Sequence, residues 1–154
     1  GEGGQAAKAR VAKGRPLVPR PNLVDASPQE LVAALKSPER WTRDAARQLI
    51  GERGRKVMEP AVHSFAASLD ESDPQFERVR LESLWALQSL NVVDEPLLST
   101  ILASNDGRAR AAAVRVLSDW SASFGDVRDR LSKAVADEHP RVRLEARPLY
   151  TSPS

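Results

Sequence analysis

The sequence predicts an all-α fold in which about four helix pairs stack in a row behind an extended N-terminal linker. Three observations support this prediction. Apolar residues recur at helical spacing, and no segment shows the sustained alternation of a half-buried strand. Prolines and Asp- or Asn-containing turns divide the chain into segments of helix length. One arginine also returns at intervals of 37, 30 and 33 residues, which is the repeat length of a helical hairpin.

Length and composition limit the classes of function that the chain can have. The chain has 154 residues, 41% hydrophobic and 29% charged, as in an ordinary globular domain, and its net charge of +2 argues against a strongly basic nucleic-acid-binding protein. It has no cysteine, which excludes disulfides, thiolate metal sites and covalent haem attachment. No apolar run approaches the roughly 18 residues of a membrane span, so no membrane insertion is expected.

Residues 1–26 are predicted to form a basic, extended linker. They contain four glycines and three prolines, which favour extended backbone. They hold no apolar core of signal-peptide length, so we expect no export signal in this chain. The opening Gly-Glu-Gly-Gly is unusual for a native start and suggests a fragment of a longer protein.

Capping and proline signals place the helices of the repeat domain, predicted over residues 27–150 with 151–154 as a tail. Ser27 and Glu30 form a capping box with a proline at the first helical position. Pro38 is expected to end that helix and open the next. Because proline is tolerated only in a first turn, Pro60 predicts a helix from about Glu59 to Leu69. Further helices are expected over 75–90, from Asp94, from Asn105-Asp106-Gly107 through Trp120, after Gly125-Asp126, and from His139-Pro140 until Pro148 ends the last one.

The recurring arginine has a predicted structural role. A small residue follows it three positions later and large aliphatic residues follow at six and seven, so helices can approach closely and fill the seam. The aliphatic part of the arginine side chain can cover apolar surface, while its guanidinium group donates hydrogen bonds to loop carbonyls or to an acid of a neighbouring repeat. Each pair cannot bury its apolar faces alone, so the pairs must stack. The aligned arginines are Arg43, Arg80, Arg110 and Arg143.

This pattern resembles the HEAT repeat, an α-solenoid unit, most closely in the segments "GRARAAAVRVL" and "PRVRLEARPLY". The resemblance implies an acid six residues before the arginine that forms an Asp–Arg ladder between repeats. Asp137 has this spacing to Arg143. Because Ser37, Pro74 and Ser104 occupy the equivalent positions, we do not expect a complete ladder.

A closer resemblance covers about residues 10–147 and is carried by "SPERWTR" and "LWAL". These strings resemble the HEAT-like region that follows the β-propeller in membrane-bound dehydrogenase-like proteins, which end in a c-type haem domain. The resemblance implies an exported redox protein as parent. This chain has no propeller and no C-x-x-C-H, so any redox chemistry is expected to lie outside these residues.

No catalytic, cofactor or metal site is predicted. His63 and His139 belong to different repeats and lack partners at the spacing of a triad or metal site. There is also no dinucleotide or Walker-type glycine loop. The sequence therefore favours a non-catalytic scaffold or protein–protein interaction module, with a flanking domain or another protein as its partner.

The rival hypothesis is a nucleic-acid-binding solenoid, because residues 40–56 form a modest basic patch with Trp41 as a possible stacking group. Against it, acids are interleaved almost everywhere else, and Trp41, like Trp85 and Trp120, fits a core position. Oligomeric state and compartment are left open. The residues expected to face a partner are Arg40, Trp41, Arg47, Arg78, Arg108 and Arg115.

Overall fold

The computed structural model describes residues 22–151. Within that range it contains eight α-helices and no β-strand, which confirms the all-α prediction. No helix in this range is both long and apolar enough to cross a membrane. Residues 1–21, most of the predicted linker, and residues 152–154 lie outside the described part.

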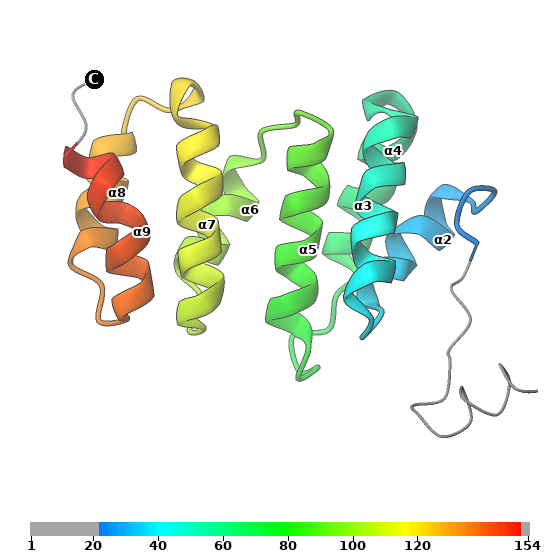
Figure 1. Ribbon diagram of the computed structural model, residues 1–154, viewed down its shortest axis with the longest axis horizontal. Coiled ribbons are helices and arrows are strands. Elements are labelled where there is room, and N and C mark those ends of the chain that lie inside the picture. The colour runs from blue at the N-terminus through cyan, green and yellow to red at the C-terminus, as the bar shows by residue number, and fades with distance from the viewer. Residues whose placement is uncertain (1–21, 152–154) are drawn as a thin grey trace, which may run out of the picture.

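The helices follow one another along the longest axis of the molecule (Figure 1). Two single-turn 3-10 segments, Ala34–Lys36 and Ser121–Ser123, accompany them. The α-helices are α2 (Pro28–Ala33), α3 (Arg40–Arg53), α4 (Arg55–Ala67), α5 (Phe76–Ser89), α6 (Glu95–Leu102), α7 (Gly107–Asp119), α8 (Val127–Val135) and α9 (Pro140–Thr151).

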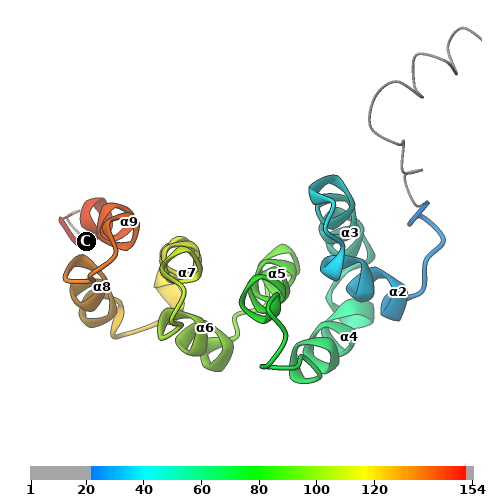
Figure 2. The same cartoon turned by 90° about the horizontal axis from the view of Figure 1, so that it is seen from below.

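The helices form two layers (Figure 2). In one layer α3, α5, α7 and α9 lie side by side, each in contact with the next. The other layer contains α4, α6 and α8, with α2 packed against α3 and α4 at one end. The row is curved, and α3, α5, α7 and α9 lie on its inner side (Figure 2). We call these two sets the inner layer and the outer layer.

Local capping explains where several helices begin. Ser27 Oγ accepts from Glu30 N and Glu30 Oε1 accepts from Ser27 N, both at 3.1 Å, which confirms the predicted capping box. Asp94 caps α6 by accepting from Leu97 N at 3.0 Å. Between α3 and α4, Gly54 has φ of +86°, a backbone conformation that other residues rarely adopt, and this allows a sharp turn without a loop.

The prediction that Pro60 begins a helix is wrong. Helix α4 starts at Arg55 and carries Pro60 as its sixth residue. The proline removes one hydrogen bond from the second turn. Met58 and Val62 lie one turn apart on the same face and are fully buried, so core packing favours a helix that starts before the proline.

Replacing Pro60 by alanine is therefore expected to raise the free energy of unfolding by about 1–2 kcal/mol, because a backbone N–H can again donate within the helix. The matched control is Pro28→Ala, at a first helical position where the missing N–H has no intrahelical partner in any case. Urea unfolding followed by circular dichroism measures both variants. A Pro60→Ala protein that is less stable than Pro28→Ala would contradict this explanation.

The expected end of the last helix at Pro148 is also wrong, because α9 continues to Thr151 with Pro148 inside it. Leu149 and Tyr150 follow the proline and pack against the buried core. Burial of these two large side chains offsets the lost hydrogen bond. The carbonyl that loses its partner belongs to Leu144, whose side chain is 69% exposed, so this carbonyl lies on a solvent-facing part of the helix.

The core consists of two clusters of buried side chains that meet at α5. Val79 and Leu87 belong to the cluster beneath α2, α3 and α4, whereas Leu81 and Leu84 belong to the cluster formed with α6 to α9. Helix α5 is thus packed on two faces. Leu23 and Ala26, at the end of the predicted linker, pack on the first cluster.

Candidate functional site

Three of the four aligned arginines lie near the start of an inner-layer helix and donate hydrogen bonds to carbonyls of the preceding turn. Arg43 Nη1 donates to the carbonyls of Ser37 and Pro38, both at 2.9 Å. Arg110 Nη1 donates to Ser104 O at 2.7 Å. Arg143 Nη1 makes the same contacts as Arg43, with Asp137 O at 2.8 Å and Glu138 O at 2.9 Å. In each case one bonded carbonyl belongs to the residue six positions before the arginine.

Arg80 is held differently, by an acid of its own helix and an aromatic ring. Its Nη2 donates to Glu77 Oε2 at 2.6 Å, and its guanidinium lies 4.8 Å from the centre of the Phe76 ring. The same Glu77 oxygen accepts from Ser104 Oγ at 2.8 Å. Arg80 is thereby linked through Glu77 to the turn that precedes α7.

Asp137 joins the last two repeats through Arg110. Arg110 Nε donates to Oδ2 and Nη2 donates to Oδ1, both at 2.8 Å, in the bidentate geometry that is strongest for such pairs. Both side chains are largely buried, at 13% and 15% exposure. The hydrogen bond from Arg110 is the main reason that the pKa of Asp137 lies below its usual value.

This shift predicts a pH-dependent loss in the Asp137→Asn variant. A lowered folded-state pKa means that the carboxylate stabilises the fold above its unfolded pKa of about 3.9, and that this contribution disappears as pH falls through the folded-state pKa. At pH 7 we expect the variant to lose about 1–2 kcal/mol of unfolding free energy. The difference from the parent protein should shrink steadily as pH falls below about 4.

Urea unfolding at pH 7, 5, 4 and 3 measures this difference. Glu71→Gln provides the control. Glu71 is an exposed loop residue, so this variant should lose little free energy of unfolding at any pH. A deficit for Asp137→Asn that is the same at pH 3 and pH 7 would show that the ion pair is not its cause.

A second acid, Glu82, joins α5 to α3. It is only 3% exposed, and its Oε1 accepts from Arg43 Nε at 3.1 Å while its Oε2 lies 3.2 Å from Arg47 Nε. Burial raises the pKa of Glu82, and the positive charges of Arg47, Arg43 and Arg78 oppose that shift. Glu82 was not among the residues predicted from the sequence to have a role. The signal was present, because Glu82 and Glu145 both lie two residues after an aligned arginine, and Glu145 pairs with Arg115 of the preceding repeat.

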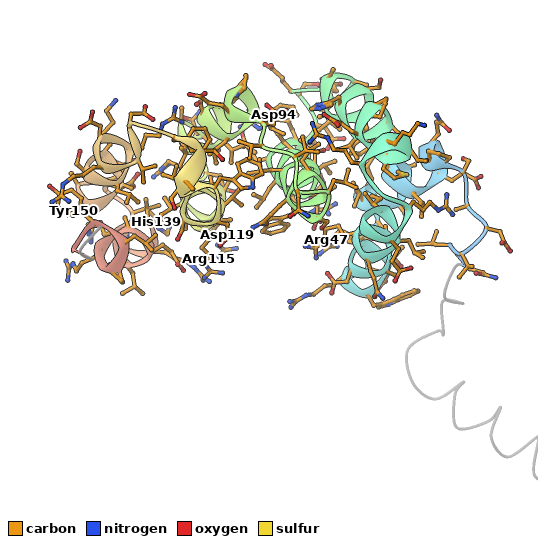
Figure 3. The ribbon with its side chains drawn as sticks, turned by 90° about the horizontal axis from the view of Figure 1, so that it is seen from above. Arg47, Asp94, Arg115, Asp119, His139 and Tyr150 are labelled. Atoms are coloured by element: carbon orange, nitrogen blue, oxygen red, sulfur yellow. The ribbon has the colours of Figure 1, made fainter. Side chains whose placement is uncertain are left out.

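The inner layer also carries a groove of about 390 Å³ between α5, α7 and the start of α9. We call it the inner groove. Four arginines and Trp85 line it, over a floor that includes Leu81 and small alanine side chains. In Figure 3, Arg47 and Arg115 lie on this side of the molecule, whereas Asp94 lies on the opposite side. The arginines of the inner groove are Arg78, Arg108, Arg115 and Arg141.

Half of the residues expected to face a partner come together in this groove, namely Arg78, Arg108 and Arg115. Arg47 lies beside it, with its guanidinium 5.1 Å from the centre of the Trp85 ring. Arg40 and Trp41, at the start of α3, are not among its lining residues.

The three tryptophans differ in their environments. Trp120 is 6% exposed within the second core cluster and Trp85 packs against that cluster. Trp41, expected in the core, is half-buried and belongs to neither cluster of the described residues. Its helix, α3, is the first of the inner layer in that part of the chain, so no preceding inner helix covers its other side.

The histidines are widely separated and hold different positions. His63 is exposed, with Nδ1 3.4 Å from an Asp94 oxygen and Nε2 3.5 Å from a Glu59 oxygen. The ring of His139 lies against Gly107, and its Nδ1 accepts from Arg141 N at 3.2 Å. No cluster of three or more His, Asp or Glu residues within residues 22–151 could hold a metal ion.

Comparisons of the chain with protein-family models, with curated proteins and with solved structures found no match. The function is therefore inferred from the placement of the groups described above.

Proposed function

We propose that the chain is a non-catalytic scaffold, a HEAT-like α-solenoid of about four helix pairs whose inner layer binds a protein partner. The observation that carries this proposal is the equivalence of the inner-layer helices. Arg43, Arg110 and Arg143 occupy the same position at the start of three of them and bond the same turn carbonyl. Repeated units of this kind stack into a curved surface that holds other domains at a set distance.

The use of charge supports binding rather than catalysis. Near the repeat interfaces, carboxylates such as Glu82 and Asp137 form ion pairs with arginines of neighbouring helices, and these pairs hold the helices together. The inner groove instead gathers arginine side chains on one face. Arginine and tryptophan are the residue types enriched at the energetic centres of protein interfaces.

The resemblance to dehydrogenase-like proteins extends this proposal. On that basis the parent is an exported redox protein, in which this segment separates a propeller from a haem domain. The segment then supplies spacing and a docking surface, while the redox chemistry belongs to the flanking domains.

Nucleic acid is the rival partner, because the groove combines arginines with Trp85. Phosphate-dominated binding depends on many cationic contacts along a continuous track. On the inner layer, Asp44 pairs with Arg47 and Glu145 pairs with Arg115. These acids interrupt such a track, so a protein partner fits the inner layer better.

Photo-crosslinking tests the proposed function. A photoreactive phenylalanine analogue replaces Arg115 in the inner layer or, as the control, exposed Lys56 on α4 in the outer layer. In an extract of the source cells, the probe at position 115 should crosslink to one discrete polypeptide and the probe at position 56 should not. Nuclease-sensitive adducts at position 115, or the same adducts from both positions, would refute a protein-binding inner layer.

A further inference from the structure

The inner groove has more positive charge than nearby carboxylates neutralise, although Arg115, one of its four arginines, pairs with Glu145. Within residues 22–151, no carboxylate lies within salt-bridge distance of the guanidinium groups of Arg108 or Arg141. Arg78 donates to Gln75 Oε1 at 2.9 Å and to Lys36 O at 3.1 Å, which are both uncharged acceptors.

The two carboxylates in the groove wall are already engaged. Glu77 accepts from Arg80 and from Ser104 Oγ. Asp106 caps α7 by accepting from Arg108 N at 2.9 Å. Neither is paired with the Arg108 or Arg141 head group, and burial together with the charge of Arg43 lowers the pKa of Arg78. The groove is therefore suited to an anionic occupant.

Its floor is apolar rather than polar. Leu81, Ala109 and Ala111 are buried beneath it, and Trp85 forms part of one wall. The Arg47 guanidinium already lies over the Trp85 ring, so this ring is less available for stacking against a nucleic-acid base. An occupant that fits both the floor and the arginines must combine apolar contacts with negative charge.

We propose that the inner groove binds an acidic, extended polypeptide segment, an inference that rests on the proposed function and specifies its partner. Carboxylates match the guanidinium fork in charge and geometry. Successive side chains of an extended segment point to opposite sides, so acidic residues can reach the arginines while the residues between them contact the floor.

The spacing of the helices favours a segment over a single small anion. Arg78 and Arg141 arise from α5 and α9, with α7 between them. Their backbones are thus separated by about two helix-packing distances, roughly 16–20 Å. An extended chain covers that distance in about five or six residues.

Fluorescence anisotropy with defined probes tests this inference. The main probe is a fluorescein-labelled ten-residue peptide in which glutamate alternates with alanine or leucine. The second has glutamine in place of every glutamate, and the third is a ten-nucleotide single-stranded DNA. The test variant is Arg108→Gln/Arg141→Gln, and the control is Lys56→Gln/Lys133→Gln, which makes the same charge change at exposed outer-layer positions.

We expect the glutamate peptide to bind the parent protein at least about tenfold more tightly than the glutamine peptide. The Arg108→Gln/Arg141→Gln variant should lose about tenfold or more in affinity, and the control variant less than about twofold. Because Arg108 and Arg141 are exposed and make no ion pair with any residue that the structure describes, both variants should unfold at the same urea concentration as the parent.

The other outcomes are distinguishable. Equal losses in the two variants, or no binding of the glutamate peptide, would overturn the inference and leave the crosslinking result to decide the proposed function. Equal binding of both peptides would also overturn it, since an apolar segment would then suffice. Tighter binding of the DNA, with affinity that falls steeply with salt, would overturn both proposals.

Discussion

Replacing Glu82 by alanine is expected to lower the free energy of unfolding by about 3–5 kcal/mol, because it leaves a buried cluster of positive charge without its carboxylate. Glu82 is 3% exposed and faces Arg43 Nε at 3.1 Å and Arg47 Nε at 3.2 Å. Native domains are stable by only about 5–15 kcal/mol, so this loss should be visible as partial unfolding at moderate temperature. Urea unfolding followed by circular dichroism measures it.

Glu145→Ala is the matched control for this prediction. Glu145 lies at the same position of its repeat and also pairs with an arginine of the preceding repeat, but its partner Arg115 is 58% exposed. An exposed pair is screened by solvent, so we expect a loss of less than about 1 kcal/mol. If the two variants lose the same free energy of unfolding, burial of the Glu82 ion pairs does not explain the loss predicted for Glu82→Ala.

Gly107→Ala is expected to destabilise the protein by about 1–3 kcal/mol through overpacking. A Cβ added at Gly107 would lie 2.2 Å from His139 Cδ2 and 2.4 Å from His139 Cγ, far inside van der Waals contact. The imidazole cannot move away freely, because its Nδ1 accepts from Arg141 N and the His139 N–H donates to Asp137 Oδ1 at 2.8 Å. The clash must therefore separate α7 from the start of α9.

Further variants test whether the steric clash with His139 causes this loss of stability. Gly51→Ala places its Cβ no closer than 3.5 Å to any neighbour and lies inside α3, so it should be neutral or stabilising by up to about 1 kcal/mol. His139→Ala removes the obstructing ring, so Gly107→Ala should cost less in that background than in the parent protein. Thermal unfolding measures the parent protein, the three single variants and the Gly107→Ala/His139→Ala double variant. An undiminished cost without His139 would refute the steric explanation.

Local signals were sufficient to predict most of the helix starts. The Ser27–Glu30 capping box and the Asp94 cap depend on neighbouring residues only, and they form as expected. The helix start predicted at Pro60 and the helix end predicted at Pro148 were wrong for the opposite reason. Each proline costs one local hydrogen bond, whereas burial of side chains around it depends on the helix that packs there.

The candidate site was predictable only in part. Arg78, Arg108 and Arg115 were expected to face a partner, and the fold brings them into one groove. That the groove lies between α5, α7 and α9 depends on which helices become neighbours. The pairing of Glu82 with Arg43 joins residues 39 apart, and no local rule specifies it.

A double-mutant cycle on Arg110 and Asp137 tests most directly whether the recurring arginines hold neighbouring repeats together. We measure unfolding free energies for Arg110→Met, Asp137→Asn and the double variant, and repeat the cycle with Arg43→Met in place of Arg110→Met. The proposed stacked array predicts a coupling of about 1–3 kcal/mol between Arg110 and Asp137, and less than about 0.5 kcal/mol between Arg43 and Asp137. A coupling near zero for Arg110 and Asp137, or one no larger than for the distant pair, would contradict it.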